Sequence, residues 1–430
     1  MSTSIYTLAD LVAVADDLTE DYVLENDIDA SASASHDGGD GWIPLGAWGV
    51  SSFTGTFDGQ GHTISGITIS RAAGYQGLFG VVTNSGVGPN TVIQNLILTD
   101  VDVSGSAFIG GLIGYATHQN TEVTNCKVYG AVKGTSLCVG LLCGVCSQGV
   151  TFTDCFSQGT AQGTSGDDKI GGLIGNCNIG ITVTGCGSIC DVSLGSSSVG
   201  GLIGNLNQSE LSYSYAKGTV SGEYYVGGLV GYCLDSDISY CAAYGNVSSA
   251  SSGNIGGLVG TATTTTSGVN ILYCYAKGSV SAAGTWSGGL IGLGEAVNST
   301  LVVGQCYASG AVTGVNKTGG LIGDVTGVNL SVDGCFAANF VSGATGVGGL
   351  IAEIDGGAVT DSYFVEADED NGIGTLETGG VAALRSYEHP VYTDAVQIWN
   401  FKTVWKIAGL PTLRELFGDW GDGAFLGISA

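Results

Sequence analysis

The chain has 430 residues, and its charged fraction of 11% is far below the share of about a quarter that is usual in soluble domains. With 44% apolar residues the chain can bury a core, which excludes a disordered protein. Its 38 acidic and 11 basic residues give a formal net charge of −27, which argues against a nucleic-acid partner and an anionic membrane surface. No apolar run approaches the roughly 18 residues of a spanning helix, so we expect no membrane insertion.

The first 41 residues are predicted to form an N-terminal cap with a short helix over 7–18. Thr7 followed by Asp10 has the spacing of a capping box, and the apolar residues after them fall on one helical face. These apolar residues are Leu8, Leu11, Val12, Ala15 and Leu18. The same stretch has neither a basic region nor a clean apolar run, so we expect no cleavable signal peptide.

A phrase of the type "VGGLVG" or "IGGLIG" recurs through the middle of the chain and predicts a repeat architecture. Its first glycines are spaced 27 to 32 residues apart. They are Gly110, Gly140, Gly171, Gly200, Gly227, Gly256, Gly288, Gly319 and Gly348. The next columns are one of leucines, beginning at Leu112, and one mostly of Ile and Val, beginning at Ile113. Such columns indicate stacked equivalent positions, with the glycines at a bend of each coil.

Each repeat holds three short segments with β character and no helical period between them. In one repeat they are "GGLIG" from Gly200, "LSYSY" from Leu211 and "GTVSG" from Gly218. Such a unit does not fit a βαβ fold. It does fit one coil of a β-solenoid, in which each strand pairs with its equivalents above and below. We therefore predict an all-β, right-handed parallel β-solenoid of about ten coils over 42–365, its hand following the usual rule for parallel crossovers.

Residues 366–430 are predicted to form a C-terminal cap, because solenoids must cover their last strand edges. After Asp361 the repeat fades into the acidic stretch "VEADEDNG", which is followed by an aromatic segment. The segment contains Trp399, Phe401, Val404, Trp405, Pro411 and Leu413.

Four stretches together resemble the GLUG-repeat proteins, over almost the whole chain. These are "FTGTFDGQGHTISGITI" from Phe53, the repeated "GGLIG", "CYASGAV" from Cys306 and "WNFKTVWKIAGLPTLREL" from Trp399. The resemblance implies a β-solenoid stalk or binding region, as in adhesins, haemagglutinin-like surface proteins and some extracellular peptidases. It implies little about activity, because the repeat is a scaffold for different functions.

Seven of the 13 cysteines share one column, and two serines stand at equivalent positions. The seven are Cys126, Cys155, Cys186, Cys241, Cys274, Cys306 and Cys335, and the serines are Ser214 and Ser362. Stacked side chains in register point alongside each other, so we predict a structural ladder of buried thiols that pack as small apolar residues. Cys143 and Cys146 have redox or zinc spacing, but their columns favour core packing. Cys190 replaces a recurring glycine, and Cys138 lies in a column that we expect to face outward.

No catalytic constellation emerges, so we predict no catalytic residues, no metal site and no cofactor. A polysaccharide-degrading solenoid would need paired carboxylates with a basic residue on one face. Asp100 with Asp102, and Asp235 with Asp237, could each share one side of a strand, but we expect both pairs to be solvated. Calcium at "DDK" from Asp167 or at "EADED" from Glu366 stays open, although neither has the ligand spacing of an EF-hand.

A binding surface can be nominated in the column just before the double glycine. This column reads Phe108, Cys138, Lys169, Ser198, Tyr225, Asn254, Trp286, Lys317 and Gly346. Its variability indicates an outward position, so we expect Phe108, Tyr225 and Trp286, together with Tyr224, to be exposed aromatics that contact a ligand. Ordinary exposure or a subunit contact is the alternative.

The sequence therefore predicts a non-enzymatic, adhesive component of a surface fibre. The absence of a signal and the reduced thiols favour a virion protein, such as a phage tail fibre or decoration protein. A bacterial cell-surface adhesin is the alternative, and a polysaccharide-degrading β-helix enzyme is the second alternative. The expected partners are a surface glycan or protein receptor, further copies of the chain in a homo-oligomer, or other virion or surface proteins.

Overall fold

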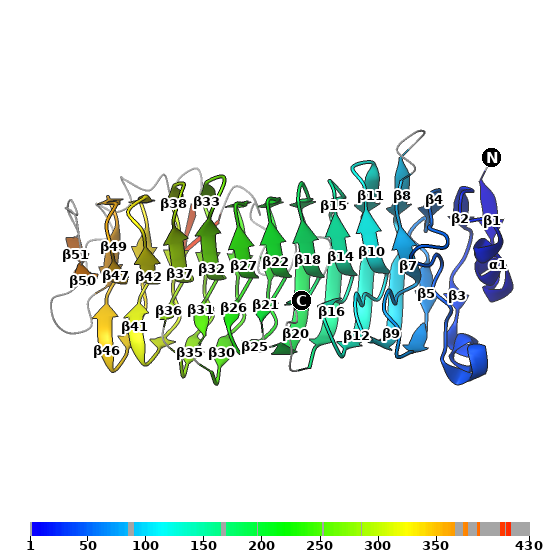
Figure 1. Cartoon of the computed structure of the whole chain (residues 1–430), viewed down its shortest axis with the longest axis horizontal. Helices are drawn as coiled ribbons and strands as arrows, with labels where there is room; N and C mark the ends of the chain where they lie inside the picture. The colour runs from blue at the N-terminus through cyan, green and yellow to red at the C-terminus, as the bar shows by residue number, and fades with distance from the viewer. Residues whose placement is uncertain are drawn as a thin grey trace.

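The protein is an elongated parallel β-solenoid, whose coils lie side by side along one axis (Figure 1). The computed structural model describes residues 2–84, 90–164, 169–195, 197–251, 253–284, 286–365, 373–376, 385–387, 405–408 and 410–413. The predicted all-β solenoid of about ten coils is confirmed, since one sheet alone stacks 11 strands. The hand of the coil stays a prediction.

The N-terminal end is covered by a short helix, as predicted, with a shorter span. Helix α1 (Leu8–Ala13) begins at the capping box of Thr7 and Asp10, and it continues as the 3-10 helix η1 (Val14–Asp16). The predicted apolar face is wrong at Val12 and Ala15, which are exposed, because the helix gives way to a tighter 3-10 turn that buries Val14 instead. Two further 3-10 helices follow, η2 (Ser31–Ser35) and η3 (Asp37–Gly39).

Sheet 1 lies directly before the double glycine of each coil and has eight strands. They are β13 (Cys138–Gly140), β17 (Lys169–Gly171), β21 (Ser198–Gly200), β26 (Tyr225–Gly227), β31 (Asn254–Gly256), β36 (Trp286–Gly288), β41 (Asn316–Gly319) and β46 (Thr345–Gly348). Sheet 2 lies directly after the double glycine and has 11 strands. They are β7 (Phe79–Val82), β10 (Ile113–Thr117), β14 (Cys143–Ser147), β18 (Ile174–Asn178), β22 (Ile203–Asn207), β27 (Val230–Leu234), β32 (Val259–Thr264), β37 (Ile291–Ala296), β42 (Ile322–Thr326), β47 (Ile351–Ile354) and β50 (Ile373–Leu376).

Sheet 3 follows sheet 2 in each coil and has 13 strands. They are β1 (Thr3–Ile5), β2 (Tyr22–Leu24), β4 (Thr56–Asp58), β8 (Thr91–Gln94), β11 (Thr121–Thr124), β15 (Thr151–Thr153), β19 (Thr182–Thr184), β23 (Glu210–Ser212), β28 (Asp237–Ser239), β33 (Val269–Leu272), β38 (Leu301–Gly304), β43 (Leu330–Asp333) and β48 (Ala358–Thr360). All of its pairings are parallel and join equivalent positions of successive coils.

Sheet 4 completes each coil, and from Tyr215 onward it consists of two short strands per coil. Its strands are β3 (Ile28–Asp29), β5 (Thr63–Ser65), β6 (Thr68–Ser70), β9 (Ile97–Gly105), β12 (Lys127–Gly134), β16 (Phe156–Gln162), β20 (Gly187–Gly195), β24 (Tyr215–Ala216), β25 (Val220–Gly222), β29 (Ala242–Ala243), β30 (Val247–Ser249), β34 (Tyr275–Ala276), β35 (Val280–Ala282), β39 (Tyr307–Ala308), β40 (Val312–Thr313), β44 (Phe336–Ala337), β45 (Val341–Ser342), β49 (Tyr363–Val365) and β51 (Arg385–Tyr387).

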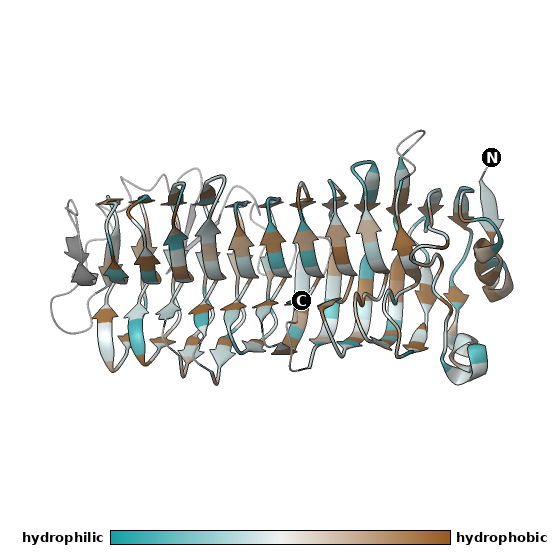
Figure 2. Ribbon diagram, viewed as in Figure 1, coloured by the Kyte–Doolittle hydropathy of each residue, from teal (hydrophilic) through white to brown (hydrophobic). Residues whose placement is uncertain are grey.

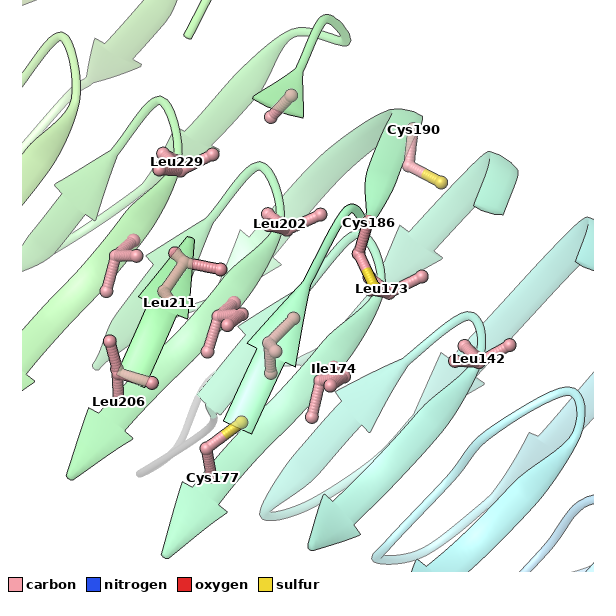
Figure 3. Close-up of a cluster of buried hydrophobic side chains, with 14 of the residues drawn as sticks. Leu142, Leu173, Ile174, Cys177, Cys186, Cys190, Leu202, Leu206, Leu211 and Leu229 are labelled. Carbon is pink, nitrogen blue, oxygen red and sulfur yellow. The ribbon is translucent and has the colours of Figure 1, made fainter. Parts of the chain in front are cut away.

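The repeated phrase is the corner between sheets 1 and 2, as expected. A Cβ atom on Gly200 would lie 2.0 Å from the carbonyl oxygen of Ile203, which no side chain could tolerate. The leucines that follow this corner, among them Leu142, Leu173, Leu202 and Leu229, stack one above another inside the coil (Figure 3). Hydrophobic residues recur at matching places of successive coils (Figure 2), so one continuous core runs along the solenoid.

The segment "LSYSY" from Leu211 differs from the predicted single strand. Strand β23 ends at Ser212, and Tyr213 adopts a left-handed backbone with φ +52°, which turns the chain from sheet 3 to sheet 4. At the C-terminal end, β52 (Trp405–Ala408) pairs antiparallel with β53 (Leu410–Leu413). Trp399, Phe401 and Val404 of the predicted C-terminal cap lie outside the described residues, and the domain boundaries at 41 and 365 stay predictions.

Candidate functional site

Two columns of side chains meet outside the core, on either side of the double-glycine corner. The first is the nominated column on sheet 1, and the second stands seven residues later on sheet 2. Its members are Tyr115, Val145, Asn176, Asn205, Tyr232, Thr261, Leu293, Asp324 and Glu353, which pair in register from coil to coil. No member of either column belongs to the continuous hydrophobic cluster inside the coil, although Cys138, Val145 and Leu293 are buried. We call these two columns, together with Trp48 and Tyr75, the corner strip.

An aromatic cluster forms the N-terminal end of the corner strip. Trp48 stacks on Tyr75 with ring centroids 5.4 Å apart and an interplanar angle of 3°, and its edge meets Tyr115 at 5.2 Å. Tyr75 also packs against Phe108 at 4.9 Å. Trp48 is 56% exposed, so the cluster presents a broad aromatic surface to solvent.

The backbone under this cluster is strained at two of its rings. Tyr75 has φ +61° and Phe108 has φ +57°, a left-handed conformation that bulky residues rarely adopt. Such a conformation costs on the order of 1–3 kcal/mol and is held only where the surrounding structure fixes it. Both rings therefore occupy positions at which asparagine or glycine would be less strained.

The middle of the corner strip, from Lys169 to Thr261, is polar apart from one aromatic pair. Tyr225 packs against Tyr232 across the corner, with centroids 5.2 Å apart. In the next coil the Asn254 amide donates to the Thr261 hydroxyl at 2.9 Å. Contacts across the corner, between residues seven apart in sequence, thus recur along the strip.

The C-terminal end of the corner strip brings two carboxylates to one lysine. Lys317 Nζ lies 3.0 Å from Asp324 Oδ2, 2.8 Å from Glu353 Oε1 and 5.8 Å from the ring centre of Trp286. Burial raises the pKa of Asp324 to about 6, although its bond to Lys317 acts in the opposite direction. For Lys317 burial lowers the pKa, but hydrogen bonds to Glu353 and Asp324 outweigh it, so the net shift is upward.

The structure places three of the four nominated aromatics in the corner strip. Phe108, Tyr225 and Trp286 are only partly exposed. Tyr115 packs against Phe108, Tyr232 against Tyr225, and Lys317 lies over the ring of Trp286. Tyr224 is 50% exposed and lies outside the strip. Sequence reasoning missed Trp48 and the whole second column.

The thiol ladder lies at the corner between sheets 3 and 4, directly before the strands of sheet 4. The Cys155 amide donates to Cys186 Sγ at 3.4 Å, and the Cys186 amide donates to the Ser214 hydroxyl at 3.1 Å. The same bond joins Cys335 to Ser362 at 3.1 Å. The thiols are buried and free, and Cys186 and Cys274, like Ser214 and Ser362, also accept a hydrogen bond from a buried backbone amide of the preceding coil.

All 13 cysteines are buried free thiols. Cys138 was expected to face outward into solvent, but it is only 3% exposed. Cys190 donates to the Gly172 carbonyl, and burial raises its pKa to about 11. Cys143 and Cys146 lie in the core, with Cys146 Sγ 3.5 Å from Cys177 Sγ.

Carboxylates do not gather into a metal site in the described part of the chain. No three His, Cys, Asp or Glu side chains there lie close enough to hold an ion. Asp100 and Asp102 are both exposed on β9, as expected. The acidic stretch from Glu366, and Asp167 and Asp168 of "DDK", lie outside the described residues.

Asp235 was expected to be solvated, and this is wrong. It sits in the turn between β27 and β28, where it is 5% exposed. Burial would raise its pKa, but hydrogen bonds from the hydroxyl and amide groups of Thr266 and Thr265 outweigh this and lower it. Asp235 thus anchors a turn of the next coil, whereas Asp237 is exposed.

Comparison with known proteins identifies the class of this solenoid. The GLUG motif matches residues 195–221, which span one corner and the strands on either side of it. The chain is thus a β-solenoid that carries a match to the GLUG motif in one of its coils. No helix in the described residues is long and apolar enough to cross a membrane.

Two relatives share part of the chain. Halomucin of Haloquadratum walsbyi is 33% identical over 150 residues, and a protein of Evansella cellulosilytica provisionally named a Gly-rich membrane protein is 39% identical over 127 residues. These matches cover 34% and 28% of this chain. The chain spans only 2% and 14% of the lengths of these two relatives.

Two solved structures align with most of the chain. A protein of Bacteroides ovatus, provisionally described as an immunoglobulin A1 protease, has 17% identity and a TM-score of 0.39, with 96% of this chain and 92% of that chain covered. An IgA1 protease has 14% identity and a TM-score of 0.27, with 96% and 25% covered. Neither score supports an inference about activity.

Proposed function

We propose that this chain is a non-enzymatic, adhesive part of a surface fibre, which binds a surface glycan or a protein receptor through the corner strip. The observation that carries the proposal is the strained backbone of Tyr75 and Phe108, beneath a partly exposed aromatic cluster. Strain of this kind is held by the surrounding structure, and strained residues cluster at functional sites. Flat aromatic surfaces beside hydrogen-bonding groups suit sugar rings, which have apolar faces and polar edges.

We favour a cell surface over a virion as the location of the fibre. The GLUG motif and the relative provisionally named a Gly-rich membrane protein support this choice. A virion location and a homo-oligomer stay predictions from the sequence. The rigid core along the solenoid suits a protein that holds its binding strip away from an anchoring point.

Attachment assays test the proposal with matched variants. The fluorescently labelled chain is incubated with insoluble cellulose, insoluble chitin and isolated bacterial cell envelopes. We expect Phe108→Ala, Tyr225→Ala and Trp286→Ala to weaken attachment, whereas the control Tyr224→Ala, outside the strip, keeps it. A triple strip variant that folds and attaches as the unmodified chain does would refute the proposal.

Polysaccharide cleavage is a second candidate function, favoured by one observation. Asp324 and Glu353 form a carboxylate pair beside a basic residue and Trp286, which is the combination that a polysaccharide-degrading solenoid needs. Release of reducing ends from soluble polysaccharides would be measured for the unmodified chain and for Asp324→Asn. Cleavage that is lost in this variant would favour the enzyme over the adhesin.

A further inference from the structure

A column of left-handed residues runs along the corner between sheets 3 and 4, directly before the thiol ladder. Its φ angles lie between +42° and +68°. The column reads Asn95, Asn125, Asp154, Gly185, Tyr213, Tyr240, Tyr273, Gln305, Gly334 and Asp361. Asn, Asp and Gly adopt this conformation readily, whereas tyrosine does so rarely. Three consecutive tyrosines at these positions are therefore not required by the turn itself.

The three tyrosines form a stacked ladder. Tyr213 lies 5.1 Å from Tyr240 with an interplanar angle of 11°, and Tyr240 lies 4.7 Å from Tyr273 with an angle of 5°. These spacings match the separation of about 4.8 Å between neighbouring strands, so each coil contributes one ring. Tyr213 is the first ring of the ladder and is 38% exposed.

The column has a gap directly before Tyr213, because Gly185 has no side chain. A Cβ atom on Gly185 would lie 2.2 Å from Asp154 Oδ1, so the carboxylate of Asp154 lies beside the Gly185 backbone. No other ring among the described residues stacks on the face of Tyr213 that points away from Tyr240. This end of the ladder therefore combines an aromatic face with a nearby carboxylate.

Hydroxyl groups border the same place. Thr184 and Ser212 directly precede Gly185 and Tyr213, and they pair in register on sheet 3. Their hydroxyl oxygens are 3.0 Å apart. The position of Gly185 thus combines a neighbouring aromatic face and a carboxylate with two hydroxyls on the adjacent residues of the chain.

We propose that the gap at Gly185 is a subsite for a single sugar ring, which stacks on Tyr213 and hydrogen-bonds to Asp154 through its hydroxyl groups. A ring that fills one rung would continue the tyrosine ladder at the usual stacking distance. The Thr184 and Ser212 hydroxyls would meet the polar edge of the ring. This subsite is separate from the corner strip and does not depend on it.

The test introduces residue types that already occur at equivalent positions of this column in other coils. Gly185→Asn fills the gap with the residue found at Asn95 and Asn125, and it needs only a flexible carboxylate to move. Tyr213→Asn removes the aromatic face in the same way. Tyr273→Asn, at the far end of the ladder, is the matched control. All variants are made in the Phe108→Ala, Tyr225→Ala and Trp286→Ala triple background, so that binding at the corner strip contributes as little as possible.

Binding of cellohexaose, maltohexaose and chitohexaose is followed by the ring signals of labelled tyrosines, with circular dichroism to confirm folding. For at least one sugar we expect a dissociation constant on the order of 1 mM. Gly185→Asn should abolish binding, Tyr213→Asn should weaken it by about two- to tenfold, and Tyr273→Asn should leave it unchanged. If none of the three sugars binds, or if folded Gly185→Asn binds as its parent does, the subsite does not exist.

Discussion

Trp48 lies flat on Tyr75, with an interplanar angle of 3° and ring centroids 5.4 Å apart, although the two residues belong to different coils. The loop that carries Trp48 thereby extends the corner strip beyond the first "GGLIG" repeat. The contact joins the exposed ring of Trp48 to Tyr75, whose backbone is strained. The N-terminal end of the strip is therefore an aromatic surface that the fold holds in place.

Replacing Trp48 should affect binding much more than stability. Trp48→Ala removes a stacking partner that is mostly exposed, so we expect a loss of less than about 1.5 kcal/mol in the free energy of unfolding. Attachment to the glycan or receptor should fall at least severalfold. Val50→Ala, in the same exposed loop, is the control and should change neither. Equal attachment by both variants would remove Trp48 from the site.

The thiol ladder predicts that serine, but not alanine, can replace cysteine. Cys186→Ala would leave the buried Cys155 amide without its acceptor, at a cost of about 1–3 kcal/mol. Cys186→Ser should cost much less, since Ser214 makes the equivalent bond one coil further on. Urea unfolding of the two variants measures the difference. If both are equally stable, the thiol is only a filler.

The corner glycines should be intolerant of any side chain. In Gly171→Ala the new methyl group would lie 2.0 Å from the Ile174 carbonyl oxygen, a backbone atom that cannot move away. We expect a loss of about 1–3 kcal/mol or more, measured by thermal unfolding. Gly304→Ala is the control, because its methyl group would crowd a movable side chain, that of Leu272 at 2.9 Å, and no backbone atom closer than 4.0 Å. A corner variant as stable as this control would contradict the proposed role of the double glycine.

Stability should depend on pH through Asp324. Its pKa is raised from 3.8 to about 6, with Lys317, Glu353 and Asp355 facing it, so the folded protein binds more protons than the unfolded chain between these values. The contribution is present in full below pH 4 and is lost as the pH rises through 6, by about 1–3 kcal/mol. Asp324→Asn should flatten this part of the curve of unfolding free energy against pH. An unchanged curve would assign the dependence to other groups.

Much of the fold could be predicted because equivalent residues of successive coils stack in register. A residue type that recurs at the repeat spacing in the sequence therefore forms a column in the structure. The double glycines, the leucines after them and the cysteine column were all readable in this way. The pairing of Tyr225 with Tyr232 was not, because the angle of the double-glycine corner cannot be read from residue types. Tyr213 was assigned to a strand because tyrosine favours strands, whereas the coil forces it into a left-handed turn. Asp235 was misassigned because its partners, Thr265 and Thr266, belong to the following coil.

The most direct test of the account is a crystal structure of the chain soaked with whichever oligosaccharide it binds best. The account predicts density for sugar rings along the corner strip, with at least one ring stacked on Trp48 or Phe108. Sugar bound at Gly185 in addition would support the second subsite. Density confined to other faces, with an unliganded strip at saturating sugar, would contradict the claim that the strip is the binding surface.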